Sequence, residues 1–340
     1  MGAATLPDIN SQYWNAAKYA FMGSKAGVSL SYTPWLRKLV NDVALANLSG
    51  YYKIGDSDLQ AVGASLRYFS LGDVPYNPIT GESTGNYSVS PYEMAFDVSY
   101  SRKLSDVFSM AVALRYIRSD MGASSDADMV PDNAFAADIA GYLEKYVILG
   151  NSECLWSFGF NVSNIGTKVS YDGGNTNQFL PTTLKVGTGL LYPIDDYNQI
   201  GIYVDLSKYL VPVEPRQDSG EDEADFNKRK EDYNNMSPIT GIFKSFGDSP
   251  NGFKGELEEI MASIGLEYNY NQQFFVRGGY YYENKYQGNR QYFSVGAGFR
   301  MSVFQLDAAY LISTVQSNPL DQTLRFSLSF DMDGIKNLFR

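Results

Sequence analysis

Large apolar residues recur at every second position in many parts of this chain. Between residues 108 and 116 the even positions are large and apolar, while the odd positions are small or polar. One face carries Phe108, Met110, Val112, Leu114 and Tyr116, and the other carries Ser109, Ala111, Ala113 and Arg115. Because successive side chains of a strand point to opposite faces, this period of two predicts a β-strand with one apolar face.

The same alternation predicts about fourteen strands. The expected spans are residues 25–33, 43–54, 59–71, 91–104, 107–119, 133–147, 154–163, 181–193, 198–212, 259–270, 273–286, 289–300, 303–316 and 321–331. Strands of soluble globular proteins usually have about five or six residues, whereas a tilted strand that crosses a membrane needs about 9–11. The lengths therefore favour an all-β, transmembrane antiparallel β-barrel over a soluble sandwich of two sheets.

The connections between these strands alternate in length. Those after even-numbered strands are short, and the long ones follow odd-numbered strands, at residues 72–90, 120–132, 164–180 and 213–258. Barrels of the outer membrane have short periplasmic turns and long extracellular loops. We therefore expect a barrel over residues 25–340 in the cell outer membrane, with both chain ends on the periplasmic side and the longest extracellular loop at about 213–258.

Charged residues of both signs lie on the small or polar face of the expected strands. They are Arg67, Arg115, Lys185, Arg277, Arg300 and Arg325, with Asp97, Asp138, Asp205, Glu267 and Asp307. In a closed barrel this face lines the lumen, where opposite charges can pair with each other. We expect an ion-paired interior, and a channel for a ligand is the alternative.

Residues 1–24 do not follow the period of two. Asp8 is placed to cap a helix. Apolar or aromatic residues then follow at helical spacing, namely Ile9, Tyr13, Trp14, Ala17 and Ala20. We expect a short helix that plugs the periplasmic mouth of the barrel.

The longest loop has two unlike halves. Residues 214–235 are dense in charge, which favours a mobile segment. The second half is apolar, and Ser237 and Pro238 can begin a helix there. Its candidate partner-binding residues are Ile239, Ile242, Phe243, Phe246 and Phe253. An apolar helix needs a surface to cover, so this segment either folds over the barrel mouth or docks onto a partner.

Charge and composition narrow the possible functions. The chain has 27 basic and 38 acidic residues, a formal net charge of -11, and no dense basic cluster. Phosphate binding needs a basic surface, so we expect no nucleic-acid partner. The first residues, Met1 to Thr5, lack the charged and apolar regions of a secretory signal peptide, so we expect a processed or truncated start.

Catalytic chemistry has little support in this sequence. The chain contains no His, which excludes Ser-His-Asp and Cys-His catalytic arrangements and His-ligated metal sites. Its one cysteine, Cys154, has no partner for an internal disulfide and is interpreted as a small packed residue. We therefore expect no catalytic residue, no metal and no cofactor.

Several stretches resemble the PorV family of outer-membrane barrels from the type IX secretion system of Bacteroidota, which is similar in turn to the FadL-type barrels. They are residues 2–15 (GAATLPDINSQYWN), 27–35 (GVSLSYTPW), 238–246 (PITGIFKSF), 252–260 (GFKGELEEI), 288–298 (GNRQYFSVGAG) and 318–327 (NPLDQTLRFS). The family usually has Asn-Pro-Ala near the start, where this chain has Asn15, Ala16 and Ala17. This departure concerns the turn of the plug, not the barrel.

The resemblance implies a function that periodicity does not show. PorV-like proteins bind the C-terminal signal domains of secreted cargo, receive them from the SprA/Sov translocon and pass them to the PorU-containing attachment complex. Outer-membrane lipid would surround the barrel. Two alternatives stay open at this point: a FadL-like channel for hydrophobic small molecules, and a lipid A deacylase, which the lack of His disfavours.

Overall fold

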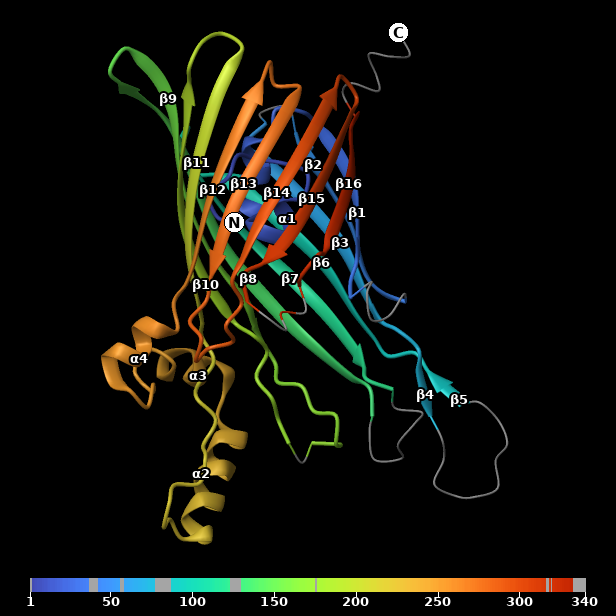
Figure 1. Cartoon of the computed structure of the whole chain (residues 1–340), viewed down its shortest axis with the longest axis vertical. Helices are drawn as coiled ribbons and strands as arrows, with labels where there is room; N and C mark the ends of the chain where they lie inside the picture. Colours follow the sequence, from blue (N-terminus) through green and yellow to red (C-terminus); the bar gives the residue numbers. More distant parts are fainter. Residues whose placement is uncertain are drawn as a thin grey trace.

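Fourteen antiparallel strands close into a barrel (Figure 1). The computed structural model describes residues 2–36, 42–55, 58–76, 87–122, 130–174, 176–315, 318 and 320–332. Within them, neighbouring strands follow the sequence order from β1 to β3 and from β6 to β16, and β16 pairs with β1 to close the barrel. The all-β barrel that the period of two predicted is therefore confirmed.

The barrel strands lie close to the predicted spans. Their bounds are β1 (Ala26–Pro34), β2 (Val43–Ile54), β3 (Gln60–Leu71), β6 (Tyr92–Lys103), β7 (Phe108–Asp120), β8 (Asp132–Leu149), β9 (Ser152–Gly166), β10 (Thr183–Pro193), β11 (Asn198–Tyr209), β12 (Met261–Tyr270), β13 (Phe274–Tyr282), β14 (Tyr292–Met301), β15 (Phe304–Ser313) and β16 (Leu324–Asp331). The longest, β8 and β9, have 18 and 15 residues.

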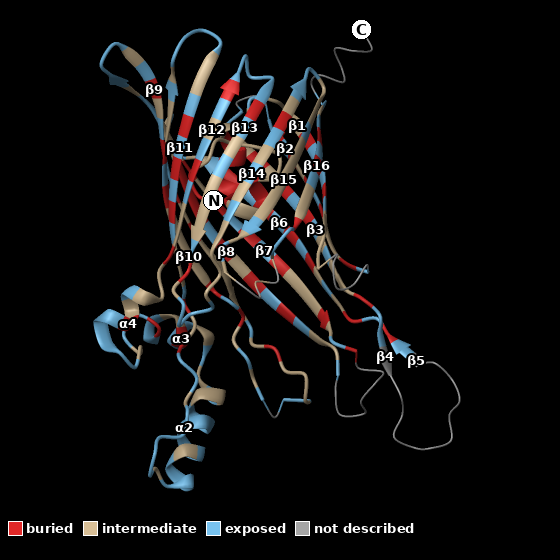
Figure 2. Ribbon diagram, in the orientation of Figure 1, coloured by how far each residue is buried: buried red, intermediate tan, exposed pale blue. Residues whose placement is uncertain are grey.

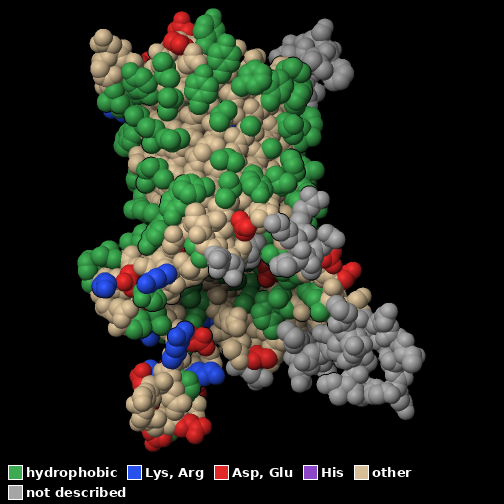
Figure 3. Space-filling model, in the orientation of Figure 1, with side chains coloured by type: hydrophobic (Ala, Val, Ile, Leu, Met, Phe, Trp, Pro, Cys, Tyr) green, Lys and Arg blue, Asp and Glu red, His purple; other side chains and the backbone are tan. Residues whose placement is uncertain are grey.

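The outward face of the barrel is apolar. On β1, Val28, Leu30 and Tyr32 are exposed, and they alternate with the buried Ser29 and Ser31. Hydrophobic side chains cover the barrel wall in the same way on the face that Figure 3 shows. Their exposure in a folded chain is what an outer-membrane barrel presents to lipid.

Short turns gather at one end of the barrel and long loops at the other (Figure 1). We call these ends the short-turn end and the long-loop end. At the short-turn end, Asn271 and Gln272 join β12 to β13 with positive φ angles of 53° and 54°, the conformation that a tight type I′ hairpin requires.

The long-loop end carries the remaining elements. They are the small strands β4 (Val74–Tyr76) and β5 (Tyr87–Val89) and the helices α2 (Glu223–Asn235), α3 (Pro238–Lys244) and α4 (Gly252–Glu258). The expected long loops at 72–90 and 120–132 lie partly outside the described residues. Among the residues that are described, no helix is long and apolar enough to cross a membrane.

The helices in the longest loop test two expectations. The expected helix start at Ser237 is confirmed, because the Ser237 hydroxyl accepts the Thr240 N–H at 3.2 Å and Pro238 lies in the first turn of α3. The charge-dense half of the loop, in contrast, contains the thirteen-residue helix α2. Asp222 caps this helix by accepting the Ala224 N–H, so local capping supplies a start signal within a charged segment.

The N-terminal segment lies inside the barrel, where Figure 2 shows its buried residues. It forms two short helices, α1 (Ser11–Trp14) and the 3₁₀ helix η1 (Ala16–Phe21). The expectation of one helix capped by Asp8 is wrong, because α1 follows Asn10 and ends at Asn15, whose backbone is extended. We call residues 2–21 the plug.

Candidate functional site

Two clusters of charge line the lumen, and each places one arginine between two carboxylates. In the first cluster, Arg115 of β7 pairs with Asp97 of β6 and, at 2.9 Å, with Asp138 of β8. All three residues are buried. The cluster joins three neighbouring strands. Its buried charges are tolerated because they are paired and hydrogen-bonded.

The second cluster lies in another part of the wall. Arg277 of β13 pairs with Glu267 of β12 at 2.6 Å and with Asp307 of β15. The predicted ion-paired interior is therefore confirmed at both clusters.

The first residues of the plug are bound to the lumen wall through their backbone. Asp205 of β11 accepts the N–H groups of Gly2 and Ala3 at 2.6 and 3.2 Å. Ser157 of β9 donates to the carbonyl of Ala4 at 2.6 Å. These buried hydrogen bonds satisfy backbone groups of a segment that lies outside any helix or strand.

Asn15 connects the two helices of the plug to the wall. Its Nδ2 donates to the carbonyls of Ala3 and Gly141, both at 2.9 Å, and its Oδ1 accepts the Ala17 N–H at 3.1 Å. One fully buried side chain thus caps η1, binds β8 and joins both parts of the plug.

Glycines on the lumen face give the plug room to approach the wall. At Gly159 of β9, an added Cβ would lie 1.9 Å from the Ala3 carbonyl oxygen. At Gly63 of β3, it would lie 2.5 Å from Gln12 Oε1. Small residues at these points allow backbone and side chains to meet where a larger residue would clash.

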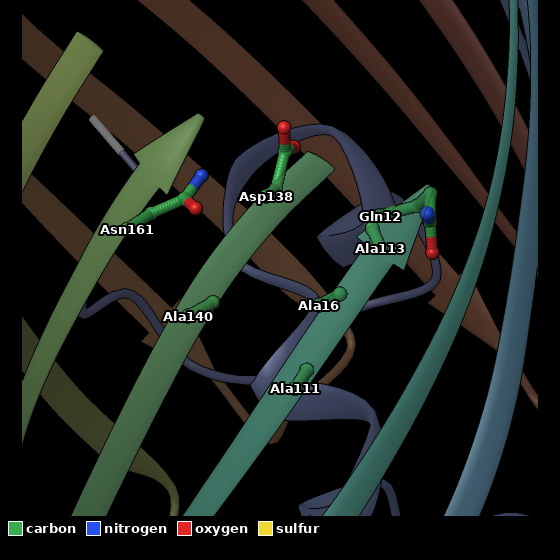
Figure 4. Close-up of a pocket in the computed structure, with 7 residues that line it drawn as sticks. All are labelled: Gln12, Ala16, Ala111, Ala113, Asp138, Ala140 and Asn161. Carbon is green, nitrogen blue, oxygen red and sulfur yellow. The ribbon is translucent and has the colours of Figure 1, made fainter. Parts of the chain in front are cut away.

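A recess remains between the plug and strands β7 to β9 (Figure 4). It is lined by Gln12, Ala16, Ala111, Ala113, Asp138, Ala140 and Asn161. It leaves no room for even a water molecule, whereas typical ligand pockets enclose roughly 300–1,000 Å³. This recess is too small for a chain-like hydrophobic ligand.

Most of the predicted partner-binding residues form an exposed apolar surface at the long-loop end. On α3 and the residues after it, Ile239, Phe243 and Phe246 are exposed, Phe243 by 73%. On α4, Phe253 is 79% exposed, whereas Ile242 is half-buried. We call Ile239, Phe243, Phe246, Phe253 and the exposed Leu257 of α4 the apolar rim. Their exposure means that the rim side chains are not buried against the barrel mouth. Figure 1 shows α4 beside the end of the barrel wall.

A lysine in the loop between β9 and β10 fixes α2 and α3 relative to the barrel. Lys168 Nζ donates to the carbonyls of Tyr233 and Asn234, both at 3.0 Å, and lies 3.9 Å from the centre of the Phe179 ring. Phe179 also packs edge-on against Tyr233 and lies close to Gly241 of α3. A cation at the last carbonyls of a helix stabilises that helix end.

A second lysine fixes α4. Lys208, near the end of β11, pairs with Glu256 at 2.8 Å and with Glu259. Burial would raise the pKa of the Glu256 carboxyl. The hydrogen bonds from Lys208 and from the Ser249 N–H, together with the charge of Lys208, outweigh burial and hold this pKa below the ordinary value of 4.5. Of the helices that carry the apolar rim, α4 is therefore attached to the barrel through Lys208, and α3 lies against Phe179.

The roles of the residues that position these parts were not predicted from the sequence. Asp205 was expected on the lumen face without an assigned partner, Asn15 was noted only as part of a family motif, and Lys168 and Lys208 were not singled out. The one usable signal was Asn15 itself, an amide side chain in the middle of a helical pattern.

The closed barrel is similar to solved transporter structures. The toluene transporter TodX of *Pseudomonas putida* matches with a TM-score of 0.54 and 10% identity, over 97% of this chain and 94% of that chain. The TodX deltaS2S3 mutant matches with a TM-score of 0.51 and 11% identity, over 97% and 95%. A FadL homologue of *Pseudomonas aeruginosa* matches with a TM-score of 0.48 and 12% identity, over 97% and 95%. At such low identity this likeness shows the barrel fold alone.

Comparison by sequence identifies the family. None of the curated proteins matches the chain. The family described as type IX secretion system protein PorV matches residues 1–216, which is more than half of the 340 residues and runs from the plug past β11. Together with the barrel fold, this match makes the protein an outer-membrane component of type IX secretion. The chain belongs to the PorV family of type IX secretion system proteins.

Proposed function

We propose that this protein binds the C-terminal signal domain of secreted cargo at its long-loop end. It then carries the cargo from the SprA/Sov translocon to the PorU-containing attachment complex. The observation that carries this proposal is the apolar rim, a group of large exposed side chains that lies on helices outside the barrel wall. The family match supports a role in secretion.

The rim has the properties of a binding surface. Phe243 and Phe253 are each more than 70% exposed, and full burial of such a side chain contributes about 1.5–3 kcal/mol. Aromatic anchors commonly dominate the energy of protein interfaces. Because Lys208 fixes α4 and Phe179 lies against α3, little conformational freedom is lost when a partner binds.

The lumen supports binding at the surface over transport through the barrel. The plug occupies the interior and is hydrogen-bonded to β8, β9 and β11. The wall around it carries paired charges, whereas a channel for hydrophobic molecules would need an apolar path. We therefore propose a carrier that acts without catalysis, with the hydrophobic channel as the second outcome of the test.

The test is a pull-down from detergent-solubilised outer membranes with a type IX signal domain as bait. Replacement of Phe243, Phe246 and Phe253 by Ser should reduce retention at least about tenfold, because each change removes apolar area worth more than 1 kcal/mol. Tyr286→Ser is the matched control, since Tyr286 is also a loop aromatic and is 71% exposed. Equal retention of the triple variant, with normal heat-modifiable gel mobility, would remove the rim from the proposal.

A further inference from the structure

Two basic residues of the lumen wall rest on the aromatic tip of the plug. Arg67 of β3 places its guanidinium carbon 4.4 Å from the centre of the Tyr13 ring, and Lys185 of β10 places Nζ 5.0 Å from the Trp14 ring. Tyr13 and Trp14 pack edge to face with centroids 4.4 Å apart. Two cations from separate parts of the wall thus flank one aromatic pair.

The positive charge of this group is not neutralised by an ion pair among the described residues. In the β3–β6 register Arg67 is opposite Ala95, and two acids are diagonal to it. Asp97 is bonded to Arg115 and to Ser65, and the exposed Glu93 accepts the Ser119 hydroxyl. In the β10–β11 register Lys185 is opposite Ser207, and the acid diagonal to it is Asp205. Its Oδ2 accepts two backbone N–H groups of the plug, while its Oδ1 has no hydrogen-bond partner among the described residues. Among the described residues, none of these three acids forms an ion pair with Arg67 or Lys185.

Buried polar atoms without partners lie beside Arg67. Asn47 of β2 is directly opposite Arg67 in the β2–β3 register and only 5% exposed. Neither its amide nitrogen nor its amide oxygen has a hydrogen-bond partner among the described residues, and the same holds for Arg67 Nε. A buried polar group without a partner is costly, and a bound ligand that supplies hydrogen bonds would remove this cost.

The group is reachable from the long-loop end. Arg67 and Lys185 lie in the halves of β3 and β10 that lead to the long loops. They and the two aromatic residues are half-buried, whereas Ala16 to Ala20 of η1 are buried. Phe21, the last residue of η1, contacts Lys103 at the short-turn end of β6. The plug therefore presents its aromatic tip to the open side.

We propose that Arg67, Lys185 and Asn47 bind a chain-terminal carboxylate that enters the lumen from the long-loop end. A guanidinium can bind a carboxylate through two hydrogen bonds, and Asn47 Nδ2 can donate a further one. Tyr13 and Trp14 are half-buried, and the parts of their rings that the two cations leave uncovered can contact the apolar part of the chain behind the carboxylate. This inference rests on the proposed function, because the C-terminus of a bound cargo signal domain carries such a group. A fatty acid carries the same group.

The test compares one signal domain with a free C-terminal carboxylate and with a C-terminal amide. We expect the full-length protein to bind the acid about tenfold more tightly, as a charge-assisted hydrogen bond implies. Arg67→Gln and Lys185→Gln should each bring the two affinities close together. Arg300→Gln is the matched control, because Arg300 is a lumen-facing arginine at the short-turn end that bonds to Gln305. It should keep the preference for the acid.

A second probe separates the sources of the carboxylate. Decanoate is titrated against a variant whose Trp35 and Trp156 are Phe, so that fluorescence reports Trp14 alone. One outcome is that decanoate quenches this fluorescence, that Lys185→Gln abolishes the quenching, and that the acid and amide domains bind equally. This outcome would support the site and assign it to a lipid acid. Equal binding of both domains with no quenching overturns the site but leaves the apolar rim intact. If neither signal domain binds but decanoate still quenches the Trp14 fluorescence, only the cargo proposal is overturned. If Arg67→Gln does not fold, Lys185→Gln decides.

Discussion

The plug should be released by one added methyl group at Gly159. The Cβ of Gly159→Ala would lie 1.9 Å from the Ala3 carbonyl oxygen and 2.7 Å from its carbon, so the Ala3 backbone must move by about 1 Å or more. This shift breaks the hydrogen bonds that Ala3 makes with Asn15 and Asp205, and it strains the bond from Ser157 to Ala4. At about 1 kcal/mol each, the loss is roughly 2–4 kcal/mol, which raises the population of the released plug roughly 30- to 700-fold.

Hydrogen exchange measured by mass spectrometry on residues 2–21 tests this magnitude. When closing is faster than exchange, the rate of exchange is proportional to the population of the open state. The matched control is Gly278→Ala in β13, where an added Cβ would meet no atom within 4 Å. Exchange in the Gly159→Ala plug that equals the wild-type rate, in a barrel with normal gel mobility, would refute the reasoning.

Three further predictions concern stability and the attachment of the helices. Arg115→Met leaves two buried carboxylates without their cation, so we expect about 3–5 kcal/mol of destabilisation, seen as a lower unfolding temperature in the gel-mobility assay. An unchanged unfolding temperature would contradict the stabilising role of the Arg115 ion pairs. Lys168→Met removes the bonds to the end of α2, so limited proteolysis should cut this helix several-fold faster. Unchanged cutting would show that Lys168 does not hold it. The folded-state pKa of Glu256 is lowered. The stabilisation that its carboxylate contributes to the attachment of α4 is therefore complete above about pH 4.5 and is lost as the pH falls further. Cargo retention should therefore hold at pH 6 and weaken below pH 4.5, and a retention that is flat to pH 3.5 would refute this attachment of α4.

The barrel was predictable because its pattern is repeated and local. Alternation alone placed strands such as residues 43–54 within a residue or two, since one face meets lipid and the other the lumen along the whole strand. The lumen charges were predictable for the same reason, because Arg115 and Asp97 fall on the polar face of adjacent strands.

The plug was only partly predictable, because its shape depends on contacts that are distant in the sequence. Asn15 leaves the helical conformation to bond with Gly141, 126 positions away, and a helical period contains no sign of that partner. Four of the five residues of the apolar rim were singled out from the sequence. The attachment of α2 through Lys168, in contrast, joins two loops that no local pattern relates.

Site-directed photo-crosslinking in cells that export cargo tests the central claim most directly. A photoreactive phenylalanine analogue is placed at Phe243 and at Phe253 of the apolar rim, and at Tyr146, which is 63% exposed near the short-turn end. The account predicts crosslinks from positions 243 and 253 to a cargo signal domain or to the translocon, and none from position 146. Crosslinks to cargo from position 146 alone would contradict binding at the long-loop end.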